Sequence, residues 1–144
     1  MLDDLYQEII LDHYRRPRNK GALEPHDMAA KESNPLCGDE IEVTARLKDG
    51  KIEEIKFAGH GCAISQASAS IMTTKLVGKT LPEAENLITD LLKMMRGDRQ
   101  FGGKELGDIK ALEGVLKFPV RVKCATLAWH IAQKGITTLK GEAA

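Results

Sequence analysis

The sequence has few aromatic residues, no excess charge of either sign and no long apolar run. Aromatic residues make up 4% of the 144 residues, so a core must be built mainly from aliphatic side chains. Lys and Arg number 21 and are balanced by 21 Asp and Glu, whereas a protein that binds a phosphate backbone usually carries a basic excess. No apolar stretch approaches the roughly 18 residues of a membrane span. These absences argue against nucleic acid or a membrane as the principal partner.

Cysteine is scarce as well, with only Cys37, Cys62 and Cys124 present. The N-terminal residues are acidic before they are basic, and they lack the apolar segment of a signal peptide. An odd number of cysteines without an export signal disfavours a disulfide framework and favours a cytoplasmic protein with reduced thiols. Such thiols either have a chemical role or are inert and buried in the core.

The remaining composition, 42% hydrophobic and 29% charged, is typical of a globular protein, and the length suits one α+β domain over residues 1–144. The apolar periodicity and the turn residues predict the following elements. Helices are expected before Pro17, between Cys62 and Gly78, between Thr80 and Gly97, near 109–116, and from Pro119 to Gly135; strands are expected at 28–33, 41–47 and around 55–57. The glycine-rich stretch 97–107 has no periodicity and is predicted to be a loop.

The Asp49-Gly50 pair indicates a hairpin between the second and third strands. A simple two-residue turn would place Ile55 and Phe57 on the opposite face of the hairpin from Val43, because side chains alternate along a strand. The pattern therefore predicts a β-bulge or a longer loop that restores a common apolar face.

The three cysteines and one carboxylate form the candidate site. Cys37 and Asp39 lie in NPLCGD, Cys62 lies in GHGC, and Cys124 lies in RVKC. No pair makes a Cys-X-X-Cys motif, so spacing alone is a weak indication of a metal. Cys62 precedes one predicted helix and Cys124 lies in the first turns of another, where the helix dipole favours a thiolate. Three thiolates with Asp39 would make a tetrahedral site of the kind that zinc favours, and thiolates also suit iron and Fe–S clusters. Cys124 also shares an apolar stripe, so a plain core role stays open for it.

Four stretches of the sequence carry a family resemblance: LYQEIILDHYRRPRN, NPLCGDEIEV, GHGCAISQASAS and FPVRVKCATLAW. They resemble the iron–sulfur assembly scaffold proteins of the IscU and NifU N-terminal type over nearly the whole length. The resemblance maps the three cysteines and the Asp of that family onto Cys37, Cys62, Cys124 and Asp39. It implies a small antiparallel three-stranded sheet with helices packed on one face (the IscU/SufE-like fold).

Two departures indicate the SufU branch of this family. Lys123 stands where housekeeping scaffolds carry a His before the third cysteine, and 118–122 reads FPVRV where they carry a Leu-Pro-Pro-Val-Lys chaperone motif. The glycine-rich insertion at 97–107 also matches the SufU pattern. Loss of the His puts chaperone-driven release of a finished cluster in doubt.

The resemblance implies an iron–sulfur cluster assembly protein that binds Zn²⁺ and accepts persulfide sulfur from a SufS-like cysteine desulfurase. This role is that of a sulfur carrier or zinc-dependent sulfurtransferase rather than a conventional enzyme, and its products go to downstream assembly proteins or apo-proteins. One alternative is a scaffold that holds iron or a transient [2Fe–2S] cluster on Cys37, Cys62 and Cys124. Another is a binding module with structural zinc. Cys37 is the expected sulfur acceptor, because it lies between Pro35 and Gly38 on a loop that can move.

Other residues admit both a functional and a structural interpretation. Arg121 lies three residues before Cys124, so it could pair with Asp39, or it could be a solvated arginine near a helix start. His60 is close to Cys62 in sequence, but a loop histidine is a commoner role than a metal ligand. His13 lies on an apolar stripe and is expected to be packed. Trp129 is predicted to lie off the buried stripe of its helix, against the N-terminal helix or a partner.

Overall fold

The computed structural model describes residues 2–35, 38–97 and 107–143. Its strands are β1 (Met28–Asn34), β2 (Asp39–Lys48) and β3 (Lys51–His60). Its helices are α1 (Leu2–Arg15), α2 (Ala63–Leu76), α3 (Leu81–Met94), α4 (Lys110–Glu113) and α5 (Pro119–Ala143), with 3₁₀ turns η1 (Gly107–Ile109) and η2 (Gly114–Lys117) on either side of α4. The predicted elements are thus present, except that residues 98–106 of the predicted loop lie outside the described residues.

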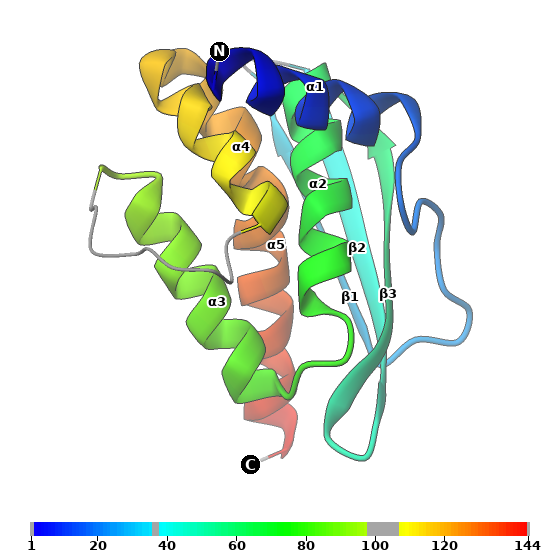
Figure 1. The fold of residues 1–144 in the computed structure, drawn as a ribbon. Helices are drawn as coiled ribbons and strands as arrows, with labels where there is room; N and C mark the ends of the chain where they lie inside the picture. Colours follow the sequence, from blue (N-terminus) through cyan, green and yellow to red (C-terminus); the bar gives the residue numbers. More distant parts are fainter. Residues whose placement is uncertain (1, 36–37, 98–106, 144) are drawn as a thin grey trace.

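The three strands form one antiparallel sheet in the order β1-β2-β3, and the helices cover one face of it (Figure 1). Helix α5 packs on β1 and β2, α2 packs on β3 and on α5, and α3 packs on α5 from the side away from the sheet. This arrangement confirms the predicted α+β fold with helices on one face. Among residues 2–35, 38–97 and 107–143, we find no helix with the length and apolar composition that crossing a bilayer requires.

The predicted bulge in the β2–β3 hairpin is present. The pairing register of β2 and β3 shifts between Arg46 and Leu47, so that Val43 pairs with Phe57 across the two strands. Both side chains are completely buried, as the common apolar face requires. The turn at 49–50 has positive φ at both residues, the backbone of a two-residue hairpin turn.

Helix α3 begins with the predicted capping box. Thr80 Oγ1 accepts the Glu83 backbone N–H at 3.3 Å, and the Glu83 carboxylate accepts the Thr80 N–H at 2.9 Å. The bond from the Thr80 N–H holds the pKa of the Glu83 carboxyl below its ordinary value.

The prediction that α5 ends at Gly135 is wrong, because the helix continues to Ala143. Gly135 lies where α5 packs against β1 rather than at a helix stop. A Cβ atom at this position would lie 2.5 Å from Met28 Sδ on β1. The absence of a side chain therefore leaves room for the methionine side chain between α5 and the sheet.

The prediction for the burial of His13 is confirmed, and the prediction for Trp129 is wrong. His13 is packed as expected, 2% exposed, with Nδ1 at 2.8 Å from Ser70 Oγ and Nε2 at 2.9 Å from Asp108 Oδ2. These contacts join α1 to α2 and to η1. Trp129, expected off the buried stripe, is instead completely buried and donates its indole N–H to Ser68 Oγ at 2.9 Å. Helix α2 is buried on nearly all sides, so its small Ser and Ala residues leave room for this ring on α5.

The Trp129–Ser68 bond gives a prediction for stability. Ser68→Ala leaves the buried indole N–H without an acceptor, so we expect the free energy of unfolding to fall by about 1–3 kcal/mol. Urea denaturation followed by circular dichroism measures this. In a Trp129→Phe background the same substitution should cost less, and an equal cost in both backgrounds would contradict the assignment.

Candidate metal centre

Three of the predicted ligands meet at one end of the sheet. Asp39 is the first residue of β2, and its neighbour in sequence, Glu40, pairs with His60 at the end of β3. The chain leaves β3 through Gly61 and enters α2 at Cys62. Cys124 comes from α5, which packs against α2 and the sheet. The fold thus joins residues that are far apart in the sequence.

One ligand atom from each of Asp39, Cys62 and Cys124 lies within 4.8 Å of the other two, close enough for one metal ion. Asp39 is 1% exposed and Cys124 is completely buried, whereas Cys62 is half-buried. Both cysteines are free thiols. The three groups therefore form a mostly buried cluster in which Cys62 lies nearest to solvent.

The two oxygens of the Asp39 carboxylate have different environments. Oδ1 accepts the Cys62 backbone N–H at 2.9 Å and the Ser65 hydroxyl at 3.1 Å. Oδ2 is buried and has no hydrogen-bond partner among the described residues. A buried carboxylate oxygen without a donor is costly, and a cation removes that cost. A carboxylate with such an oxygen, grouped with two thiols, fits a thiophilic metal ion such as zinc.

The two thiols also accept polar contacts. Cys62 is the N-cap of α2, and its Sγ accepts the Ser65 N–H at 3.5 Å. Asn34 Nδ2 lies 3.9 Å from Cys124 Sγ. Cys62 precedes α2 and Cys124 lies in the first turns of α5, as predicted. Cys124 is in the second turn, beyond the first turn in which the helix dipole is strong, so the dipole favours a thiolate only at Cys62.

The glycines of GHGC leave space for the site. Gly59 has φ +122°, and a Cβ there would overlap the Glu40 carbonyl oxygen of β2. A Cβ at Gly61 would overlap Asp39 Oδ1 and Ser65 Oγ. Any larger residue at either position would displace the backbone or the carboxylate that the cluster uses.

The other candidate residues are placed differently. Cys37 lies outside the described residues, so its predicted roles as ligand and sulfur acceptor stay predictions. Arg121 is an exposed residue in the first turn of α5, and its pairing with Asp39 also stays a prediction. His60 is exposed at the end of β3 and is outside the group of three potential ligands.

Sequence reasoning missed Ser65 and Asn34, whose side chains contact candidate ligands. A signal for Ser65 was present, because a polar residue three positions after a helix N-cap is well placed to interact with the cap. No comparable signal marks Asn34, since its contact with Cys124 depends on how α5 packs against β1.

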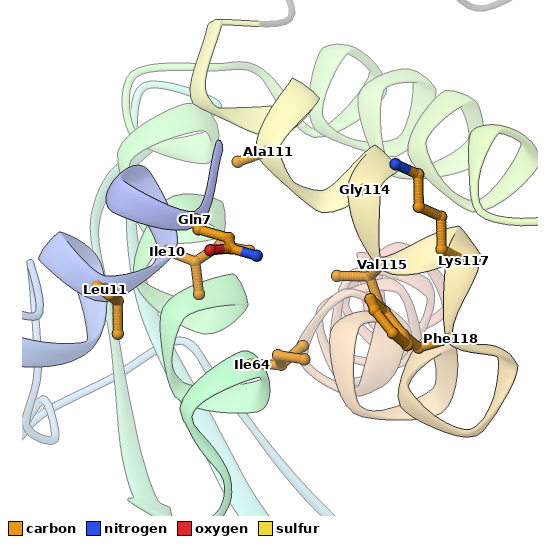
Figure 2. A pocket seen from close by; sticks show the side chains of 9 residues that line it. All are labelled: Gln7, Ile10, Leu11, Ile64, Ala111, Gly114, Val115, Lys117 and Phe118. Atoms are coloured by element: carbon orange, nitrogen blue, oxygen red, sulfur yellow. The ribbon is translucent and has the colours of Figure 1, made fainter. Parts of the chain in front are cut away.

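An apolar groove adjoins this end of the molecule (Figure 2). Its volume is about 330 Å³, and it lies between α1, the start of α2 and the segment from α4 to Phe118. Ile64, two residues after Cys62, lines it, and Phe118 is 60% exposed on its other side. The groove contributes no ligand atom to the cluster of Asp39, Cys62 and Cys124.

Comparison with known proteins shows which proteins this chain is similar to. The model of the NifU-like N-terminal domain matches residues 5–143. The zinc-dependent sulfurtransferase SufU of Bacillus subtilis is 45% identical, over 97% of this chain and 95% of its own. The iron–sulfur cluster assembly scaffold protein IscU of Streptococcus pyogenes is 43% identical, over 94% of this chain and 84% of its own.

Solved structures agree with the sequence comparisons. The crystal structure of a candidate iron–sulfur cluster assembly scaffold protein for the SUF system, from Fervidobacterium islandicum, has a TM-score of 0.85 to this chain and is 35% identical, covering 90% of this chain and 94% of its own. The match of the family model, the high identity to relatives over nearly the full length and the shared fold lead to one conclusion. The chain belongs to the NifU-like N-terminal domain family.

Proposed function

We propose that this protein is an iron–sulfur cluster assembly protein of the SufU type, which accepts persulfide sulfur from a cysteine desulfurase and binds zinc. The observation that carries the proposal is the buried cluster of Asp39, Cys62 and Cys124, in which one carboxylate oxygen has no donor. The similarity to a protein named as a zinc-dependent sulfurtransferase supports the same reading.

The donor set favours zinc. Two thiols and a carboxylate oxygen are typical ligands of zinc, and Cys37 would supply the fourth position of a tetrahedral site. The buried polar contacts at Asp39 and Cys62 hold these ligands in place without the metal. When bound, zinc would keep the thiols deprotonated and protected until sulfur is delivered.

Sulfur transfer requires a thiolate that can reach the donor. Of the three cysteines, Cys124 is completely buried and Cys62 is fixed as a helix N-cap. We assign the acceptor role to Cys37. Its thiolate would attack the outer sulfur of the donor's persulfide, so that a new S–S bond forms at Cys37. The S–S bond of the donor breaks, the donor cysteine leaves as a thiolate, and no net oxidation occurs.

The proposal includes the partners and the location of the protein. The sulfur donor is a SufS-like cysteine desulfurase, and the recipients are downstream iron–sulfur assembly proteins or apo-proteins. The proposed compartment is the cytoplasm, where thiols remain reduced, in keeping with the free thiols of Cys62 and Cys124. Exposed Arg121 would offset the negative charge of the ligands from the first turn of α5.

A second function, a scaffold for a transient [2Fe–2S] cluster, is favoured by the relatives that are named as scaffold proteins. Thiolates are ligands of such clusters and also of zinc. The colour of protein purified in air separates the two functions. A colourless protein that contains zinc supports the sulfur acceptor, and a brown protein with visible absorption supports the scaffold.

Metal content tests the site directly. We expect about one zinc per chain, because three or four protein ligands bind structural zinc tightly. Replacing Cys62 and Cys124 together by Ala should abolish zinc binding, measured by elemental analysis. The apo form should keep its helices in circular dichroism, because the apolar core cluster does not include the proposed ligands. Zinc content unchanged in the double variant would rule this site out.

The identity of the acceptor is tested by mass spectrometry. Cys37→Ala should abolish the sulfur that is added to the protein after incubation with a desulfurase and cysteine. Peptide mapping of the wild-type protein should place the added sulfur on Cys37, because the other two thiols are held by α2 and α5. Persulfide found mainly on Cys62 or Cys124 would overturn the assignment.

A further inference from the structure

Ser65 contacts two of the three candidate ligands from the first turn of α2. Its side chain is completely buried. Its backbone N–H donates to Cys62 Sγ at 3.5 Å, and its hydroxyl lies 3.1 Å from Asp39 Oδ1. The same hydroxyl lies 3.0 Å from the Cys62 carbonyl oxygen.

A serine hydroxyl has one proton to donate, and here it has two acceptors. The proton is therefore shared between Asp39 Oδ1 and the Cys62 carbonyl, or it alternates between them. Oδ1 receives a second bond from the Cys62 N–H, whereas Oδ2 receives none among the described residues. The result is a carboxylate with one oxygen held by the protein and one left for a cation.

From this geometry we propose that Ser65 is a positioning residue that makes Asp39 a one-oxygen ligand of the metal. With Oδ1 held by Ser65 and the Cys62 N–H, Oδ2 is the oxygen that is left without a protein donor and is available to a metal. This inference rests on the metal site and is independent of sulfur transfer.

The backbone at Gly61 also limits the position of the Asp39 carboxylate. A Cβ there would overlap both Asp39 Oδ1 and Ser65 Oγ. The hydroxyl and the carboxylate oxygen thus fit into a space that only glycine leaves open. The bond between them is set by packing as well as by hydrogen bonding, as expected of a group that orients a metal ligand.

Ser65→Ala removes the hydroxyl without stranding either acceptor. Asp39 Oδ1 keeps the Cys62 N–H, and the Cys62 carbonyl keeps the Gln66 N–H at 3.1 Å. Alanine is also the best helix former. We therefore expect the apo variant to fold, so that a change in metal binding reports on Asp39.

The test measures zinc affinity by competition with a chromophoric chelator, and the visible spectrum of the Co²⁺-substituted protein. Ser65→Ala should weaken zinc binding about tenfold, the usual effect of losing a partner of a metal ligand, and should shift the Co²⁺ bands. In an Asp39→Ala background the same substitution should change the affinity by less than about twofold, because the effect acts through Asp39. Equal weakening in both backgrounds, or no change in either, would overturn the proposal.

Thr74→Val is the matched control. Thr74 lies in the same helix, and its hydroxyl donates to the Ile71 carbonyl at 2.7 Å, far from any ligand. Its loss should leave the zinc affinity and the Co²⁺ spectrum unchanged.

If Ser65→Ala does not fold, Ser65→Thr and Ser65→Val provide a pair of equal shape. The Thr variant should bind zinc about tenfold more tightly than the Val variant, and equal affinities would overturn the proposal. A wild-type protein that binds no zinc would instead overturn the metal site itself.

Discussion

A buried carboxylate carries a large desolvation cost, and Asp39 offsets only part of it with hydrogen bonds. Its Oδ1 is held by the Cys62 N–H and the Ser65 hydroxyl, and its Oδ2 has no donor among the described residues. The oxygen that is satisfied fixes the side chain, and the oxygen that is not is available to a cation. A metal ion beside two thiols would be such a cation, so the site depends on this asymmetry.

The fold supplies the elements that keep this asymmetry in place. The antiparallel register brings the start of β2 beside the end of β3, and a glycine turn leads from β3 directly into α2. Helix α2 is buried from Ser65 to Thr73, so its neighbours hold the body of the helix in place behind Cys62. Cys124 comes from α5, which Trp129 anchors to Ser68 of α2. The candidate ligands Asp39, Cys62 and Cys124 therefore lie on three packed elements.

Local patterns in the sequence predicted the features that depend on residues close together in the chain. The β-bulge followed from the alternation of Val43 and Phe57, and the capping box of Thr80 followed from the spacing of two polar residues. Gly135 and Trp129 were misread for one reason, because both are determined by what α5 packs against. A glycine that ends a helix and a glycine that admits a neighbouring strand look identical in one sequence.

The site shows the same division between local and tertiary information. The family motifs predict Asp39, Cys62 and Cys124 as ligands, and the fold brings these three residues together. The role of Ser65 depends on the direction of one hydroxyl toward a strand that lies many residues earlier in the chain. The pattern of residues after Cys62 cannot report that direction.

The most direct test of the account is X-ray absorption at the zinc edge of the purified wild-type protein. The account predicts four ligands: three sulfurs at about 2.3 Å, from Cys37, Cys62 and Cys124, and one oxygen at about 2.0–2.2 Å, from Asp39. A shell that contains imidazole nitrogen, or one made of oxygens alone, would contradict it.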